Sequence, residues 1–323
     1  MAAGEAPDDL LDRRLLFVTG KGGVGKTTIA AALALVAAER GKKVLVGEVD
    51  AKGNLADFYS VGPTRFQPSK VQPNLFAMTL DPEESLKEYL TLQLKLPMMA
   101  RIGPLARIFE FVATAAPGVR EVLTVGKFLW EVENKDWDLV VVDAVATGHI
   151  VGQLAAPQAI NELVHVGLIR TQTDWMIETL ADPARTGLCV VATPEEMPVN
   201  ETIELAQRIH AETDVDLAAV VVNRVLPELF GRGEEEVFEA LEADAGRKAL
   251  RDALDGAGAT DAIVDAARLA VTLRRTRAEH LDRLRDELPS DIPVLFVPEL
   301  FTRGHGLRST RLVAEALGAE LGY

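Results

Sequence analysis

A glycine-rich loop between two apolar segments constrains the fold of this chain more than any other feature. Residues 20–28 read Gly-Lys-Gly-Gly-Val-Gly-Lys-Thr-Thr, which fits the phosphate-binding pattern G-x-x-x-x-G-K-[S/T]. The loop follows residues 15–18, an apolar run typical of a buried parallel strand, and leads into an alanine-rich helix expected over residues 25–40. Glycines let backbone N–H groups turn toward phosphate oxygens, and a helix N-terminus adds positive charge there. The sequence therefore predicts a phosphate site between the first strand and the first helix.

The rest of the chain alternates between short apolar runs and helical segments. We expect further strands at residues 43–49, 75–80, 137–142, 187–192, 217–222 and 293–297. We expect helices that start near residue 81 and that cover residues 147–182, 199–211, 234–288 and 307–317, with a loop around residues 170–174. This alternation predicts an α/β fold with a doubly wound, mainly parallel sheet.

Two connections between the expected strands are longer than a crossover helix needs. We predict that they form a helical insert subdomain, at about residues 81–135 and 150–185, on the side of the sheet where ligands bind. The start of the chain is acidic and lacks the basic and apolar parts of a signal peptide, so residues 1–13 are expected to be a disordered leader. Residues 14–323 are then expected to form a single P-loop domain.

The side chains in and around the loop predict nucleotide chemistry. Lys26 can neutralise phosphate charge and Thr27 offers a hydroxyl ligand, so ATP and Mg²⁺ are the expected nucleotide and metal. Asp143 ends an apolar strand and is expected to bind Mg²⁺ through water. Asp50 follows the strand at residues 43–49 and is expected to orient the attacking water and to touch the hydration shell of Mg²⁺. Nucleotide contacts are expected from the whole loop: Gly20, Lys21, Gly22, Gly23, Val24, Gly25, Lys26, Thr27 and Thr28.

Lys21 is a second lysine inside the loop, and cradling phosphate does not require it. With this lysine the loop resembles the deviant phosphate-loop class of SIMIBI-type P-loop NTPases. That class includes the ArsA and guided-entry ATPases, the ParA and MinD partitioning ATPases and the nitrogenase iron protein. The resemblance implies that Lys21 reaches across a dimer interface to the partner's nucleotide and acts in catalysis together with Lys26 and Asp50. It also implies a homodimer or a heterodimer with a paralogue.

Later segments resemble the ArsA and guided-entry ATPases in particular. Residues 143–149 read Asp-Ala-Val-Ala-Thr-Gly-His and are similar to the second switch of that family, which implies a contact between the Gly148 N–H and the γ-phosphate. His149 fits either a helix start or a switch residue. By resemblance, Asn223 hydrogen-bonds the adenine edge, and Pro298 belongs to a late proline turn that packs near the base.

Charge and cysteine content discriminate between functions within this class. The chain has 34 lysine and arginine residues against 49 aspartate and glutamate residues, and its formal charge of −15 disfavours nucleic acid and anionic membranes as partners. Cys189 is the only cysteine, so the chain lacks both the thiolates for arsenite capture and the Cys-x-x-Cys pair of the guided-entry zinc clamp. The longest apolar run, residues 29–38, is too short to span a bilayer, so we expect a cytoplasmic protein without an integral membrane segment.

The apolar helical stretch over residues 90–130 has two interpretations. Its side chains suit either the core of a helical layer or a groove for a hydrophobic client that opens with the nucleotide state. We predict a Mg²⁺-dependent ATPase of the ArsA/guided-entry type that hydrolyses ATP in a nucleotide-closed dimer to control binding of a hydrophobic client or partner protein. The alternative is a ParA/MinD-like positioning ATPase that acts on DNA or membrane, because residues 52–54, Lys-Gly-Asn, are closer to the ParA form of the first switch.

Overall fold

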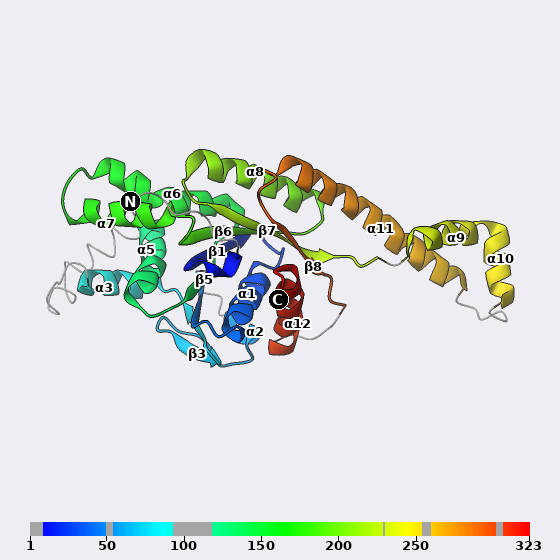
Figure 1. The fold of residues 1–323 in the computed structure, drawn as a ribbon, viewed down its shortest axis with the longest axis horizontal. Coiled ribbons are helices and arrows are strands. Elements are labelled where there is room, and N and C mark those ends of the chain that lie inside the picture. Colours follow the sequence, from blue (N-terminus) through cyan, green and yellow to red (C-terminus); the bar gives the residue numbers. More distant parts are fainter. Residues whose placement is uncertain (1–8, 50–53, 93–117, 229, 254–259, 302–305) are drawn as a thin grey trace.

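A single eight-stranded sheet forms the centre of the molecule (Figure 1). The computed structural model describes residues 9–49, 54–92, 118–228, 230–253, 260–301 and 306–323. The strand order is β3-β4-β2-β5-β1-β6-β7-β8, and every pairing is parallel except that of β3 with β4. The strands are β1 (Leu15–Gly20), β2 (Val44–Glu48), β3 (Ser69–Gln72), β4 (Leu75–Thr79), β5 (Leu139–Asp143), β6 (Thr186–Ala192), β7 (Leu217–Val225) and β8 (Val294–Pro298). The predicted doubly wound, mainly parallel sheet is confirmed, and β3 is an additional edge strand.

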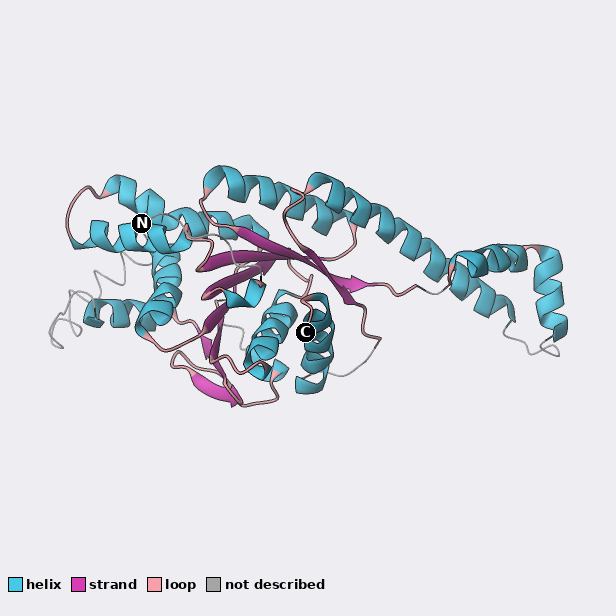
Figure 2. Ribbon diagram, in the orientation of Figure 1, coloured by secondary structure: helices cyan, strands magenta, loops and turns pink. Residues whose placement is uncertain are grey.

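Three helices cover one face of this sheet (Figure 2). They are α1 (Lys26–Glu39), α2 (Asn54–Phe58) and α12 (Leu307–Glu320). Every residue of α1 from 29 to 38 is buried, because the helix lies between the sheet on one side and α2 and α12 on the other. Such a helix is apolar all round rather than amphipathic, which explains its run of alanine and leucine.

A second helical layer covers the opposite face of the sheet. It contains α5 (Val119–Asn134), α6 (Thr147–Leu163), α7 (Leu168–Leu180) and α8 (Glu196–Glu212), with α3 (Pro82–Leu92) packed on α5. Alternate residues of β1 serve the two layers: Leu16 and Val18 join the core under α1, whereas Leu15 and Phe17 join the core under α5 and α6. The sheet is therefore buried on both faces, as parallel sheets are.

A long helical arm extends beyond the β8 edge of the sheet (Figure 1). It consists of α9 (Arg232–Glu242), α10 (Asp244–Ala253) and the N-terminal part of α11 (Thr260–Glu287). The other end of α11 returns to the second layer, where Leu284 is fully buried. The helical region predicted over residues 234–288 is thus confirmed in its described part, which contains these three helices.

The start of the described chain differs from the predicted leader. Residues 10–12 form a 3-10 helix, and the side chains of Leu10 and Leu11 are buried in the core under α1. Arg13 is buried as well, and its guanidinium lies 2.5 Å from a carboxylate oxygen of Asp216. Residues 9–13 therefore belong to the folded domain, because their apolar and charged side chains both have partners there. Residues 1–8 lie outside the described residues.

The predicted loop around residues 170–174 is wrong. These residues lie inside α7, and the chain breaks earlier, between the end of α6 at Leu163 and the start of α7. Gly167 has a φ of +97° in this connection, a backbone conformation that favours glycine. The polar residues mistaken for a loop stabilise the helix instead, because Arg170 and Asp174 are one helical turn apart and their side chains lie 3.1 Å from each other.

The described parts of the predicted insert are helical. Asp81 caps α3, and its carboxylate accepts hydrogen bonds from the backbone N–H groups of Glu83 and Glu84 at 2.9 and 3.0 Å. Residues 93–117 lie outside the described residues, and with them most of the apolar stretch over residues 90–130. The division into one domain with an insert subdomain stays a prediction.

Candidate functional site

The glycine-rich loop lies at the carboxyl edge of the sheet, between β1 and α1. Gly20 approaches β6 so closely that a Cβ atom there would lie 2.2 Å from the carbonyl oxygen of Val191. Gly23 and Gly25 have φ angles of +91° and +96°, which are unfavourable for any residue that carries a Cβ atom. The path of the backbone thus requires three of the four loop glycines, Gly20, Gly23 and Gly25, independently of any bound phosphate.

The predicted metal ligands Thr27 and Asp143 are in direct contact. The hydroxyl of Thr27, in the first turn of α1, donates a hydrogen bond of 2.6 Å to Oδ2 of Asp143 at the end of β5. Asp143 is only 6% exposed. A hydroxyl and a carboxylate are hard oxygen donors of the kind that Mg²⁺ prefers, so these two residues fit the predicted metal. Lys26 lies beside them, and its ammonium donates to the carbonyl oxygen of Lys21 at 3.4 Å.

Asp50, the predicted water-orienting residue, lies outside the described residues. The structure does place the residue before it: the N–H of Val49 donates to the carbonyl oxygen of Asp143 at 3.1 Å. Strand β2 therefore delivers the chain to the end of β5 immediately before Asp50, since Glu48 pairs in register with Asp143.

Lys21, the second lysine of the loop, contacts a residue that the sequence analysis did not single out. Its ammonium lies 2.5 Å from Oε1 of Glu201 on α8. The other carboxylate oxygen of Glu201 accepts a hydrogen bond of 3.0 Å from the hydroxyl of Thr147, the first residue of α6. The hydrogen bond from Lys21, aided by that from Thr147, lowers the pKa of the Glu201 carboxyl below its ordinary value, so the group is ionised at neutral pH.

The segment similar to a second switch connects β5 to α6. It is tied to β1 at two points: the N–H of Ala144 donates to the carbonyl oxygen of Val18 at 2.9 Å, and the hydroxyl of Thr19 donates to that of Val145 at 2.7 Å. Gly148 and His149 are both exposed in the first turn of α6. Strand β1, which carries the glycine-rich loop, and the segment before α6 are thus joined by direct hydrogen bonds.

A cavity of about 960 Å³ opens beside the glycine-rich loop. Asn223 and Pro298, the two predicted base contacts, both line it, although they come from different strands. The side-chain amide of Asn223 donates to the carbonyl oxygen of Val24 at 2.8 Å. A Cβ atom on Gly25 would lie 2.4 Å from this amide nitrogen, so the glycine makes room for Asn223. Residues of the loop and of α12 also line it: Gly23, Gly25, Lys26, Thr27, Thr28, Ser309, Thr310 and Val313.

A second cavity, of about 380 Å³, lies among α3, α5, α6 and α7. Its lining is mainly apolar: Tyr89, Val119, Val122, Leu123, Trp130, Ile160, Leu163, Val164, Ile169, Trp175 and Met176. The large apolar side chains of Leu163 and Ile169 on its rim are 81% and 47% exposed. A buried ion pair borders the cavity, where the ammonium of Lys127 lies 2.8 Å from Oε1 of Glu131.

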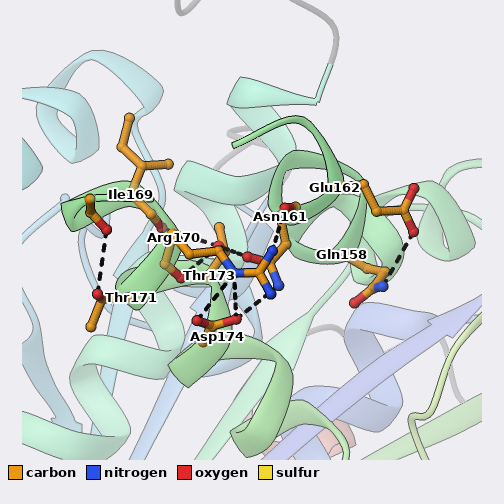
Figure 3. A network of polar contacts seen from close by, with 9 residues as sticks. Gln158, Asn161, Glu162, Ile169, Arg170, Thr171, Thr173 and Asp174 are labelled. Carbon is orange, nitrogen blue, oxygen red and sulfur yellow. Dashed lines mark hydrogen bonds and ion pairs between the residues drawn. The ribbon is translucent and has the colours of Figure 1, made fainter. Parts of the chain in front are cut away.

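Polar contacts fasten α6 to α7 beside this cavity (Figure 3). The side-chain amide of Asn161 donates to Oδ1 of Asp174 at 2.9 Å and its carbonyl accepts from the hydroxyl of Thr173 at 2.8 Å. The guanidinium of Arg170 donates to the backbone carbonyl of Asn161 at 2.7 Å. The corner of the two helices is therefore held as a unit, while the apolar side chains at its tip stay exposed.

The chain is similar to known ATPases. A family model for the anion-transporting ATPases matches residues 13–176 and 165–245. The chain is 34% identical to the ATPase BagA of Mycobacterium tuberculosis over 88% of this chain and 89% of that protein. It is 28% identical to the ATPase GET3A of Arabidopsis thaliana over 68% of this chain and 69% of that protein. It is 29% identical to the arsenical pump-driving ATPase of Acidiphilium multivorum over 66% of this chain and 40% of that protein.

The parallel sheet with a glycine-rich loop after β1 and an aspartate after β5 defines a P-loop ATPase. Within that class, the chain belongs to the anion-transporting ATPase family, which includes ArsA and GET3-type proteins. It is an enzyme that binds and hydrolyses ATP. The predicted resemblance is thus confirmed. Among the described residues, no helix combines the length and the apolar character that a bilayer crossing requires.

Proposed function

We propose that ATP hydrolysis by this chain takes place in a nucleotide-closed dimer and controls the binding of a hydrophobic client or partner protein. The observation that carries this proposal is the path of α6, which begins at the second-switch segment with Thr147 and ends at the rim of the apolar cavity with Leu163. Its 17 residues span about 25 Å. This helix is continuous, with Pro157 in its interior, and a continuous helix of this length can transmit a change at the nucleotide site to the cavity.

At the nucleotide site, we assign binding of the phosphates to the loop residues 20–28, among which Lys26 supplies the positive charge. Thr27 and Asp143 would hold Mg²⁺, which when bound supplies positive charge beside the phosphates. Asp50 would orient the attacking water from its place after β2, and the N–H of Gly148 would contact the γ-phosphate. The loop, Thr27, Asp143 and Gly148 all stand at the carboxyl edge of the sheet, where ligands of doubly wound folds bind.

The base would occupy the cavity beside the loop. Asn223 would present a polar edge there. Its side chain cannot turn freely, because its amide nitrogen donates to the carbonyl of Val24 and its Oδ1 accepts from the N–H of Arg224 at 3.0 Å. Pro298 offers an apolar surface on the neighbouring strand. We therefore retain both as the proposed base contacts, with Asn223 directed at the adenine edge.

The dimer is proposed from Lys21. In P-loop enzymes an additional cation, supplied from outside the nucleotide's own loop, accelerates phosphoryl transfer. Lys21 is a second lysine that its own loop does not need for holding phosphate, so it could supply this cation to the nucleotide of a second chain. The names of relatives such as GET3A support comparison with guided-entry ATPases, for which the resemblance implies a lysine that acts across a dimer.

The proposed client surface is the apolar cavity with the exposed tip of α6 and α7. We propose an apolar helix of a client protein as its occupant, because Leu163, Val166 and Ile169 expose 81%, 83% and 47% of their surface around one corner. Exposed apolar side chains gathered at one place are typical of binding sites. Met176 is 4% exposed and lines the cavity behind these side chains, where its flexible side chain can adapt to an occupant.

The charges along α11 do not favour the alternative of a DNA-binding or membrane-binding ATPase. Five arginines of α11 each lie within 4 Å of a carboxylate: Arg268 with Glu242, Arg274 with Glu228, Arg275 with Glu239, Arg277 with Glu195 and Arg283 with Glu287. The positive charge of this helix is thus largely compensated, and the formal charge of the chain is −15.

Binding of an apolar tail peptide, measured by fluorescence anisotropy without nucleotide, with ADP and with a non-hydrolysable ATP analogue, tests the client proposal. We expect the affinity to differ between nucleotide states and to fall when Leu163→Asp introduces a charge at the rim. Val237→Asp is the matched control, because Val237 is 60% exposed on the distant helix α9. Equal binding in every nucleotide state would contradict the proposal, as would equal effects of the two variants.

A further inference from the structure

The carboxylate of Glu201 lies between two parts of the nucleotide site that come from distant places in the chain. One oxygen is 2.5 Å from the ammonium of Lys21 in the glycine-rich loop, and the other accepts from the hydroxyl of Thr147 at 3.0 Å. Glu201 itself belongs to α8, a helix of the second layer. A single side chain therefore joins the loop, the second-switch segment and the helical layer.

The contact with Glu201 competes with the proposed role of Lys21. A lysine paired with a carboxylate of its own chain has its charge compensated, so it has to leave that carboxylate before it can contact a phosphate of another chain. Hydrogen bonds between two charged groups are among the strongest that side chains make. Both side chains are about 30% exposed, so water weakens this pair without removing it.

The hydrogen bond from Thr147 couples the orientation of Glu201 to the position of the second-switch segment. Thr147 is the first residue of α6, directly before Gly148, the proposed γ-phosphate contact. While Thr147 donates to Glu201, the carboxylate is held at both oxygens and its orientation suits Lys21. When Thr147 moves away, the carboxylate gains rotational freedom, and its hold on Lys21 weakens because a flexible acceptor has to lose entropy to keep the bond.

We propose that Glu201 is a positioning residue that retains Lys21 in its own chain until the second switch moves, and that it thereby opposes closure of the dimer. The proposal rests on the proposed function, in which Lys21 acts across the dimer. It adds to that function an intramolecular competitor for Lys21 and a link from Thr147 to the release of this lysine.

Self-association in the presence of ATP tests the retention of Lys21. Glu201→Gln keeps the size of the side chain and removes its charge, and we expect it to lower the protein concentration at half-association by roughly 5-fold, the scale of a partly exposed ion pair. Thr147→Val should shift the same midpoint in the same direction by less. The matched control is Glu204→Gln, an exposed glutamate one turn along α8.

The direction of the shift separates this role from a structural one. Damage to α8 would weaken self-association, whereas release of Lys21 strengthens it. Sedimentation velocity with a non-hydrolysable ATP analogue measures the midpoint without turnover. An unchanged or higher midpoint for Glu201→Gln would overturn the proposal, and an unchanged midpoint for Thr147→Val would overturn the link to the second switch.

Hydrogen exchange in the nucleotide-free chain distinguishes failure of this inference from failure of the proposed dimer. Glu201→Ala removes both contacts, so we expect faster exchange at residues 20–25 and at residues 148–150, with no change for Glu204→Ala. If the unmodified chain does not self-associate in the presence of ATP, the proposed dimer is refuted. The hydrogen-exchange comparison still shows whether Glu201 holds both segments, because it needs no dimer. An unaltered exchange rate at either segment would contradict the proposal that Glu201 stabilises both of them.

Discussion

Oγ1 of Thr27 lies 2.6 Å from Oδ2 of Asp143, a contact that joins the first turn of α1 to the end of β5. The two residues are 116 positions apart in the chain, and only the central placement of β5 beside β1 brings them together. They are the hydroxyl and the carboxylate that the sequence analysis assigns to Mg²⁺. Their direct contact makes the metal assignment testable with two small substitutions.

Asp143→Asn retains the shape of the side chain and removes its charge. We expect the Mg²⁺ concentration at half-maximal ATPase activity to rise about 10- to 100-fold, the range found when an outer-sphere partner of a metal is altered. Titration of Mg²⁺ at saturating ATP measures the effect. Thr27→Ser keeps the hydroxyl and should remain near the unmodified chain, whereas an Asp143→Asn enzyme with normal Mg²⁺ dependence would remove Asp143 from the metal site.

Asp50→Asn tests the residue proposed to orient the attacking water. Loss of a positioned base or water-orienting group costs about 100-fold or more in turnover, and we expect a decrease of at least that size. The affinity for ATP should stay nearly intact, because the substitution removes no phosphate contact. Single-turnover hydrolysis and equilibrium binding of a fluorescent ATP analogue separate the two quantities. Normal turnover would exclude Asp50 from the mechanism.

Lys21→Ala tests the action of this lysine on a second chain. We expect ATPase activity to fall by roughly 10³-fold, the lower range for loss of a cation supplied to the transferring phosphoryl group, together with loss of ATP-driven association. Mixing the variant with an excess of Lys26→Ala chains should restore part of the activity if Lys21 acts in trans. Unchanged activity and association in Lys21→Ala would refute the role.

The buried pair of Lys127 and Glu131 predicts a stability effect. Their side chains are 3% and 2% exposed, and Oε2 of Glu131 also accepts from the indole N–H of Trp137 at 2.9 Å. Glu131→Gln removes one of two carboxylates that compensate the Lys127 ammonium, because Glu88 stays 2.6 Å from it, so we expect the free energy of unfolding to fall by about 1–3 kcal/mol. Denaturant unfolding measures it. The double variant Lys127→Met/Glu131→Gln should recover part of the loss, and additive losses would contradict the pairing.

The burial of Cys189, the only cysteine in the chain, predicts that its thiol reacts slowly. It is fully buried in β6, and burial raises the pKa of its thiol to about 12. Only the thiolate reacts, so at pH 8 alkylation should be far slower than for a free cysteine and should follow global unfolding. Modification by iodoacetamide with and without denaturant measures this. Rapid labelling of the folded protein would contradict the burial and would reopen Cys189 as a ligand.

Most of the sheet and the phosphate loop were predictable because their signals are local. Apolar runs such as residues 139–142 are buried on both faces, and a buried parallel strand shows in the sequence without knowledge of its neighbours. The loop pattern at residues 20–28 likewise needs only its own glycines. Asp143 was found because it ends such a strand, and its position at the strand end is what places it beside Thr27.

Contacts over long sequence distances were not predictable in the same way. Glu201 is 180 residues from Lys21 and lies on an amphipathic helix where a glutamate is an ordinary solvent-facing residue. No local pattern marks it. The sequence did not predict the ordered start of the domain for a related reason. Leu10 and Leu11 are buried only because α1 and its neighbours cover them. In both cases the deciding partner is supplied by the tertiary fold.

The continuity of α6 has a consequence for the control of this enzyme. If the nucleotide changes the affinity of the apolar cavity through this helix, then any occupant of the cavity changes the affinity for ATP by the same factor, because coupling between two sites is reciprocal. A small apolar molecule that fills the space between Trp130 and Ile169 would then act as an allosteric effector. Such a compound would regulate the ATPase from a position about 25 Å along α6, without competing for the phosphate loop.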